Sequence, residues 1–401
     1  MIVQCHLNAP KDGRALRSGQ TLDCGRIKDD RDKKPKPIRE ESFSSKLVFE
    51  KNDFRYIDKI VDPDRRKRDG PKGYPPSSIF VALLLMYLRS MESILELVRF
   101  LNSNPDWLVT LNLKKKIMGK IQYRAPHRST FYKFANRLGP DRIVGIFSFM
   151  VVELMRVKVI KGGKMSLDCS IIRAWFYDCK HARSPKHSSR KCRHHRHRDK
   201  DASWEWDHTR EKYVYGYKVH IAIDSLSGLP IMLTVTKAGY GENRTVRWFV
   251  KMLLKISIRI EKFLADGAYD AYGTRRLLIR KLKAIPFIAL NPRNCKGNTP
   301  EGKMERCRKL RYKWYCKNFL KKWWVDPDSE TFDREFDART FSEQGFSIGK
   351  GSLNLNSLKH KGKSWATLHS ALICMVMLGV AKTAVKIGRV DLSRCVKCFQ
   401  S

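Results

Sequence analysis

Aromatic and β-branched side chains alternate with other residues through positions 212–224 of this 401-residue chain. The alternating positions are Tyr213, Tyr215, Tyr217, Val219, Ile221 and Ile223. A period of two places every second side chain on the same face, which is the pattern of a β-strand. A Ser-Gly turn and a second apolar run at 229–235 follow, so the sequence predicts a β-hairpin. The chain must therefore build a sheet and cover it.

The segments around the hairpin predict an α/β domain. A short apolar segment at 165–172 precedes the hairpin and indicates another strand. After the hairpin, helical patterns at 243–257 and 274–282 alternate with strand patterns at 262–265 and 285–290. Three consecutive strands followed by alternating helix and strand indicate a mixed sheet. An apolar helix at 365–386 is expected to dock on this sheet.

The N-terminal part of the chain has a different composition. Residues 1–45 are polar and basic and cannot bury enough apolar surface to become ordered, so a disordered tail is expected. Residues 46–157 carry helical patterns, with helix starts at Pro75-Pro76 and Ser129-Thr130 and a stop at Gly139. This all-α unit either enters a DNA groove or only packs on the enzyme domain.

Changes in composition set further boundaries. The α/β domain is expected at 158–290 and, after an interruption, at 331–390. The interruption at 291–330 is irregular, basic and interleaved with Tyr and Trp, which suits either the gripping of unpaired DNA ends or an ordinary packing insertion. A Lys-, Arg- and His-rich stretch at 181–201 predicts a mobile surface loop, and 391–401 a tail.

The charge of the chain points to nucleic acid as the partner. The sequence has 81 Lys and Arg against 40 Asp and Glu, a formal net charge of +41. Lys and Arg that neutralise phosphates release condensed counterions, and this release supplies most non-specific affinity for DNA.

The sequence predicts no membrane partner and no disulfide framework. Its apolar runs are shorter than the roughly 18–20 residues that cross a bilayer, and no secretory signal opens the chain, so the cytoplasm is expected. The 11 Cys are odd in number and irregularly spaced, which favours reduced thiols, and no pair has the spacing of a structural zinc site.

Three acidic residues are candidates for a metal-dependent site. Asp168 lies inside an otherwise apolar strand, where an unpaired charge is costly and a metal would explain it. Asp266 follows a short strand and precedes Gly267, and strand ends are where α/β sheets form ligand sites. Enzymes that cut phosphodiesters commonly use two divalent ions held by such carboxylates.

The third acid, Glu343, belongs to the most specific pattern in the chain. Phe336, Arg339, Glu343 and Lys350 follow one another at spacings of three, four and seven. On a helix these offsets share one face, so two cations would flank the acid and meet DNA phosphates.

This pattern resembles the Tyr-x2-Arg-x3-Glu-x6-Lys signature of one large branch of insertion-sequence DDE transposases of bacteria and archaea. The stretch Asp266 to Tyr269, the Ser-Leu-Asp ending at Asp168 and the helical N-terminal segment are also similar to that family. The resemblance covers residues from about 50 to 385.

The resemblance implies a ribonuclease-H-like fold, an α/β class with a mixed sheet preceded by an all-α domain. It implies that Asp168, Asp266 and Glu343 are catalytic and hold two Mg²⁺ or Mn²⁺ ions, and that Phe336, Arg339 and Lys350 contact DNA. The implied activity is hydrolysis at the element ends followed by strand transfer of the 3′-OH. The implied partners are double-stranded DNA, as terminal inverted repeats and target, and a second subunit in a homodimeric DNA complex.

Two departures leave other functions open. Phe336 lacks the hydroxyl of the signature Tyr, which removes a hydrogen bond of about 1 kcal/mol, or about twice that when the partner is charged. Gly345 and Gly349 lower helix propensity by about 1 kcal/mol each relative to Ala, and are therefore expected to favour an end of the helix before Lys350. The alternatives are a non-catalytic DNA-binding transposase remnant and a ribonuclease-H-like nuclease that cuts without strand transfer.

Overall fold

A computed structural model describes residues 43–401 except 66–72, 118–119, 176–198, 208–209 and 298. The disordered tail expected at 1–45 and most of the loop expected at 181–201 therefore lie outside the described residues. Residues Ser42–Ser401 form one compact unit.

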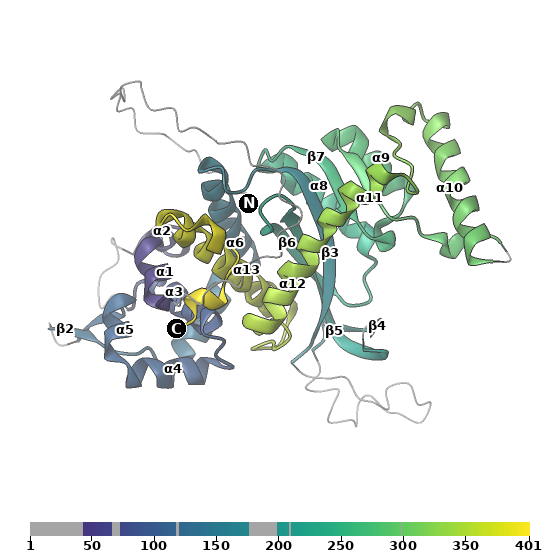
Figure 1. The fold of residues 1–401 in the computed structure, drawn as a ribbon. Helices are drawn as coiled ribbons and strands as arrows, with labels where there is room; N and C mark the ends of the chain where they lie inside the picture. The colour runs from purple at the N-terminus through teal and green to yellow at the C-terminus, as the bar shows by residue number, and fades with distance from the viewer. Residues whose placement is uncertain (1–42, 66–72, 118–119, 176–198, 208–209, 298) are drawn as a thin grey trace, which may run out of the picture. The chain divides into compact units, whose positions relative to one another are not determined.

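A mixed sheet organises this unit (Figure 1). Strand β3 (Gly163–Arg173) pairs antiparallel with β5 (Lys212–Asp224), and β5 pairs antiparallel with β4 (Ser203–Asp207) and β6 (Leu229–Lys237). Strands β7 (Ile260–Ala265) and β8 (Ile285–Ile288) continue the sheet parallel to β3. Four antiparallel strands and two parallel ones confirm the expected mixed sheet.

Strand β5 is buried on both faces along most of its length, whereas its alternating pattern by itself indicates one buried face. Ile223 points to one face and meets helix α12 (Thr340–Ser352) at Gly345. His220 and Lys218 point to the other face, where they contact Tyr269 and Glu242. Because both faces are covered, every residue from Val214 to Asp224 is buried.

Helices fill the space around the sheet. Between β6 and β8 the chain forms η1 (Glu242–Thr245), α8 (Val246–Lys255), η2 (Gly267–Tyr269), α9 (Tyr272–Leu277) and the π-helical turn η3 (Leu278–Leu282). After β8 come η4 (Pro292–Asn294), α10 (Pro300–Lys317), η5 (Lys321–Trp323), α11 (Glu330–Phe336), η6 (Asp337–Arg339), α12 and α13 (Lys363–Lys386). The expected helices and strands are thus confirmed, with ends shifted by a few residues.

The N-terminal helices are α1 (Ser45–Lys51), α2 (Tyr56–Val61), α3 (Pro76–Leu88), α4 (Ile94–Ser103), α5 (Pro105–Thr110) and α6 (Arg128–Arg156). Of these, α1, α3 and α6 pack against α13, and α13 contacts β6 and β5. All of α3 is buried, so this helix cannot enter a DNA groove. Gly139 interrupts α6 with a φ of 66°, as its stop signal predicts, but the helix resumes at Pro140.

Helix α13 is long and apolar enough to cross a bilayer, by length and composition. However, 89% of its most apolar window is buried inside the fold. That is the burial expected of the central helix of a globular core.

The segment before the sheet is helical, as expected, apart from a small hairpin of β1 (Lys114–Ile117) and β2 (Lys120–Tyr123). Two local expectations were wrong. The segment 291–330 is not irregular, since α10 occupies much of it. The last residues are not a tail: Phe399 is fully buried, and the Phe43 N–H donates to the Cys398 carbonyl.

The thiol and loop expectations also need correction. Cys395 and Cys398 form a disulfide. Within the described end of the loop expected at 181–201, Asp199 is buried and accepts a 2.6 Å hydrogen bond from the Tyr217 hydroxyl. A polar composition could not reveal this, because the partner is supplied by β5.

Replacing Gly345 by Ala should lower the free energy of unfolding. A Cβ there would lie 2.3 Å from Ile223 Cδ1, so a buried side chain must move, at a cost of about 1–3 kcal/mol. The gain in helix propensity returns only about 1 kcal/mol. Gly351→Ala in the same helix is the matched control, because nothing lies within 4 Å of its added Cβ. Urea unfolding in which both variants behave alike would contradict the close approach.

Candidate active site

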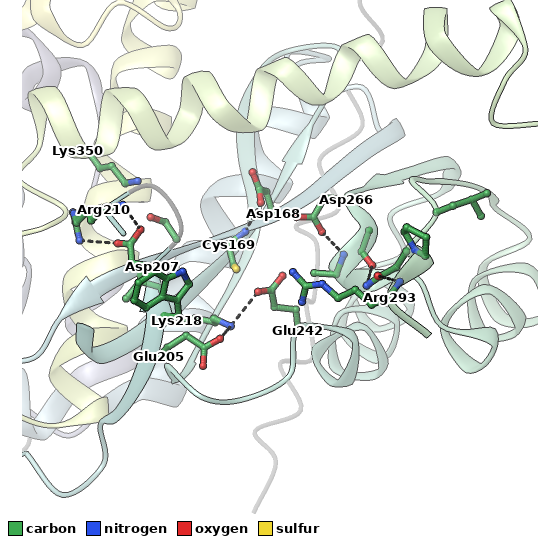
Figure 2. Close-up of a pocket in the computed structure, with 18 residues that line it drawn as sticks. Asp168, Cys169, Glu205, Asp207, Arg210, Lys218, Glu242, Asp266, Arg293 and Lys350 are labelled. Carbon is green, nitrogen blue, oxygen red and sulfur yellow. Dashed lines mark hydrogen bonds and ion pairs between the residues drawn. The ribbon is translucent and has the colours of Figure 1, made fainter. Parts of the chain in front are cut away.

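A cavity of about 590 Å³ opens where β7 ends beside β3 (Figure 2). The last β3–β7 register pair is Leu167 with Ala265, so β3 continues through Arg173 with no strand on that side among the described residues. The cavity lies along this open edge. Its charged lining consists of five acids and four bases: Asp168, Glu205, Asp207, Glu242, Asp266, Arg210, Lys218, Arg293 and Lys350.

Asp168 is the first β3 residue beyond the region that pairs with β7. Its Oδ1 accepts a 2.8 Å hydrogen bond from the Cys169 N–H, and its Oδ2 lies 3.4 Å from Arg339 Nη1. Burial raises the pKa of Asp168 to about 6, although the Arg339 guanidinium and the Cys169 N–H pull it downward. The carboxylates of Asp266 and Glu242 raise it further.

Asp266 occupies the matching position on β7, one residue after Ala265. Its side chain caps η2, with Oδ1 accepting a 3.0 Å hydrogen bond from the Ala268 N–H. Burial and then Glu242 raise the pKa of Asp266, against the opposing effect of the Ala268 N–H. The carboxylates of Asp168, Asp266 and Glu242 lie around the same space in Figure 2.

Glu343 is held differently. It lies in the first turn of α12 with 55% of its side chain exposed, and it is not among the residues that line the cavity. Its Oε1 accepts a 2.5 Å hydrogen bond from Arg339 Nη2. Arg339 therefore bridges Glu343 and Asp168, so the structure brings two of the three expected acids together and ties the third to them through a guanidinium.

The other two signature residues have different surroundings. The Phe336 ring stacks on Phe332 at 5.1 Å and is partly buried against the cluster beneath it. Lys350 lines the cavity, and burial followed by the nearby Arg210 charge lowers its pKa.

The expectation that the two glycines end the helix early is wrong. Helix α12 runs to Ser352. Gly345 and Gly349 lie where α12 packs closely, against Ile223 and Leu355. Tertiary contact thus outweighs their low helix propensity.

Sequence reasoning missed a charged group beside the acids. Lys218 is buried, with its Nζ 3.2 Å from Glu205 and 3.1 Å from Glu242. Burial alone would lower the pKa of Lys218, but Glu242 and Glu205 outweigh it and raise the pKa. A lysine inside an apolar strand pattern was the available signal, because a buried ammonium needs a carboxylate partner.

Two other acids have structural roles. Asp224 accepts hydrogen bonds from the Ser227 hydroxyl and N–H at the β5–β6 turn. Asp270 is fully buried and pairs with Arg275 and Arg311.

The cavity suits a divalent cation in its donor chemistry. Mg²⁺ prefers oxygen ligands and is usually held by one or two carboxylates together with substrate phosphates. Asp168 and Asp266 supply such a pair, and their raised pKa values reflect carboxylates crowded in a buried place. Among the described residues, no three His, Cys, Asp or Glu side chains are already arranged around one ion.

The comparison with protein families adds an independent observation. Residues 179–378, about half of the chain, match the family described as the transposase DDE domain. The chain belongs to the DDE transposase family. The matched part of this transposase contains Asp266, Glu343 and most of the sheet, whereas Asp168 lies eleven residues before it. No curated protein and no solved structure matches the chain.

Proposed function

We propose that this chain is the transposase of an insertion sequence, which cuts DNA at the element ends and joins the 3′-OH ends to target DNA. The juxtaposition of Asp168 and Asp266 at the open edge of β3 carries this proposal, because it places two carboxylates where a phosphodiester can reach them. The proposed complex is a homodimer on double-stranded DNA, and such a protein would act at the nucleoid.

Asp168, Asp266 and Glu343 would hold two Mg²⁺ or Mn²⁺ ions. Such ions activate the attacking oxygen and stabilise the leaving oxygen of an in-line displacement. Glu343 can join the two strand carboxylates because its side chain is more than half exposed. Lys218 holds Glu242 at the edge of the cavity by its ion pair.

Arg339 has a double role in this proposal. Without DNA it neutralises Asp168 and Glu343, whose carboxylates would otherwise face each other unpaired. In the complex, the guanidinium turns to a backbone phosphate, which it can bind with two parallel hydrogen bonds. Lys350 approaches the same backbone from the other end of α12.

A strand-transfer assay tests the function as a whole. The purified protein, Mg²⁺ or Mn²⁺ and a plasmid carrying the element with its flanking sequence should yield cut ends and then joined products. Cleavage without joining would identify a nuclease. DNA binding without cleavage would identify a non-catalytic remnant, and a trapped phosphoseryl or phosphotyrosyl adduct would refute the metal-dependent mechanism.

Restoring the signature hydroxyl should strengthen DNA binding. In Phe336→Tyr the ring keeps its stack on Phe332, and the added hydroxyl can donate to a phosphate beside Arg339. A hydrogen bond to a charged group contributes about 1.5–3 kcal/mol, so affinity for cleaved end DNA should rise by roughly tenfold or more. Fluorescence anisotropy measures this rise. Phe332→Tyr is the control, since that ring is buried away from the cavity; an equal rise there, or none in Phe336→Tyr, contradicts the assignment.

A further inference from the structure

A second concave surface lies between two helical segments next to the catalytic cavity. Its walls come from η1 and α8 on one side and from α9 and η3 on the other, around a volume of about 620 Å³. Five cationic side chains line it, and no acidic side chain does: Arg244, Arg247, Arg276, Arg280 and Lys281. We call this surface the basic groove.

The cations of the basic groove have no acidic partners within the part of the chain that the structure describes. Arg244 lies over the Tyr240 ring at 5.9 Å, and Arg276 donates to the Asn318 side chain at 2.8 Å. By contrast, Arg308 and Lys309 on nearby α10 pair with acids. A concave surface that gathers cations without neutralising them attracts a polyanion.

The groove is continuous with the catalytic cavity along the chain. Glu242 lines the cavity, and Asn243, the next residue in η1, lines the groove. On the other side, Asp266 is followed by η2 and then by Ala271, which begins the second wall. A strand that places one phosphate at Asp168 and Asp266 therefore has neighbouring phosphates close to the groove.

The two surfaces differ in the charge that they suit. The cavity mixes five acids with four bases, which fits cations together with a phosphate. The groove contains cations alone, and arginine forks match phosphate oxygens. Tyr240 is the one aromatic side chain in its lining, so stacking platforms for several unpaired bases are lacking there.

We propose that the basic groove holds the phosphate backbone of duplex DNA flanking the cleavage site. This inference rests on the proposed function, because it takes the cavity as the place of cleavage. The contact positions the duplex without reading its sequence, since phosphates carry no base information. Arg244 and Arg247 on one wall and Arg280 and Lys281 on the other face this backbone.

The test removes two charges and follows the salt dependence of DNA binding. The variant is Arg244→Gln/Arg247→Gln, and the probe is a random-sequence duplex of about 40 bp, roughly four helical turns. Between about 50 and 200 mM salt, the negative slope of log affinity against log salt should become shallower by about 1.8, and affinity near 150 mM should drop roughly ten- to thirtyfold. Lys251→Gln/Lys255→Gln is the matched control, because both lysines are exposed on α8 but lie outside the groove.

Several outcomes would overturn the inference. These are an unchanged slope, an equal change in the control variant, or tighter binding of an equally long RNA duplex that depends on the same arginines. Displacement of DNA from the groove by millimolar inorganic phosphate would instead make it a small-anion site. Plasmid nicking by the variant should show a raised KM with unchanged kcat. A lowered kcat would mean instead that Arg244 and Arg247 act in the chemical step and not only in DNA binding.

Failure of the groove is distinguishable from failure of the proposed function. Measuring the salt slope needs no cleavage. A wild-type protein that binds DNA but never cuts it would therefore contradict only the proposed function. Conversely, a wild-type protein that cuts, together with an unchanged salt slope in the Arg244→Gln/Arg247→Gln variant, would contradict only the inference about the basic groove.

Discussion

Asp168→Asn should abolish metal-dependent DNA cleavage while making the metal-free protein more stable. The substitution removes a ligand charge, and the metal contributes several kcal/mol to such reactions, so the cleavage rate should fall by about 10³-fold or more. Plasmid nicking in Mg²⁺ and in Mn²⁺ measures this loss. Duplex DNA binding should persist, because Arg339 and Lys350 are unchanged.

The stability effect follows from the pKa of Asp168. Burial raises this pKa to about 6, so the fold favours the protonated carboxyl. The penalty for the ionised form is absent below about pH 4, where the carboxyl is protonated in both states, grows as pH rises from about 4 to about 6, and is complete above about 6. At about pH 8, Asp168→Asn should therefore gain roughly 1–3 kcal/mol in the free energy of unfolding, and near pH 4 the gain should vanish. A loss of stability at the higher pH would show instead that the ion pair with Arg339 dominates.

Asp224→Asn is the matched control for the nicking measurement. Asp224 is fully buried in the neighbouring strand β5, its Oδ2 accepts hydrogen bonds from Ser227, and it lies outside the cavity. Its substitution should leave nicking within about twofold, a change below 0.5 kcal/mol. Loss of nicking in this variant as well would mean that general disruption, and not ligand removal, explains the effect of Asp168→Asn.

Asp270→Ala should lower the free energy of unfolding by about 3–5 kcal/mol. The Asp270 side chain is completely buried, with Oδ1 2.8 Å from Arg275 Nε and Oδ2 2.7 Å from Arg311 Nη2. Its removal leaves two buried guanidinium groups without this carboxylate partner. The same carboxylate accepts from the Asn291 N–H, and the Asn291 side chain donates to the Gly267 carbonyl beside Asp266. Nicking should therefore decline together with stability.

Thermal and urea unfolding check this prediction. Asp328→Ala is the control, because Asp328 also pairs with an arginine but 62% of its side chain is exposed. An exposed ion pair contributes about 0–1 kcal/mol, so the control should change little. Equal effects of the two substitutions would contradict the burial argument.

The sequence was most informative where a local pattern repeats. The strand at 212–224 has the bounds that its alternation predicts, because side-chain period is a property of neighbouring residues. It was least informative at β4 and α10. The mixed composition of these segments has no clear period, and their partners lie elsewhere in the chain.

The acids of the site also divide into those that a local sequence pattern indicates and one that only the tertiary structure places. Asp168 and Asp266 could be found from the sequence, since each is an acid set in or after an apolar strand, and parallel neighbours bring such positions side by side. Glu242 does not directly follow a strand in the sequence, yet it lines the cavity. Its place depends on Lys218, whose ammonium reaches it from β5 across residues distant in sequence.

The sequence alone determined the sheet, the order of its strands along the chain and two of the acids at its open edge, because periodicity and polarity act over a few residues. Only the tertiary structure decided that Arg339 stands between Asp168 and Glu343, that close packing keeps α12 helical through its glycines, and that five cations gather in the basic groove. These features arise from segments far apart in sequence, and their energies depend on burial and on which charges become neighbours.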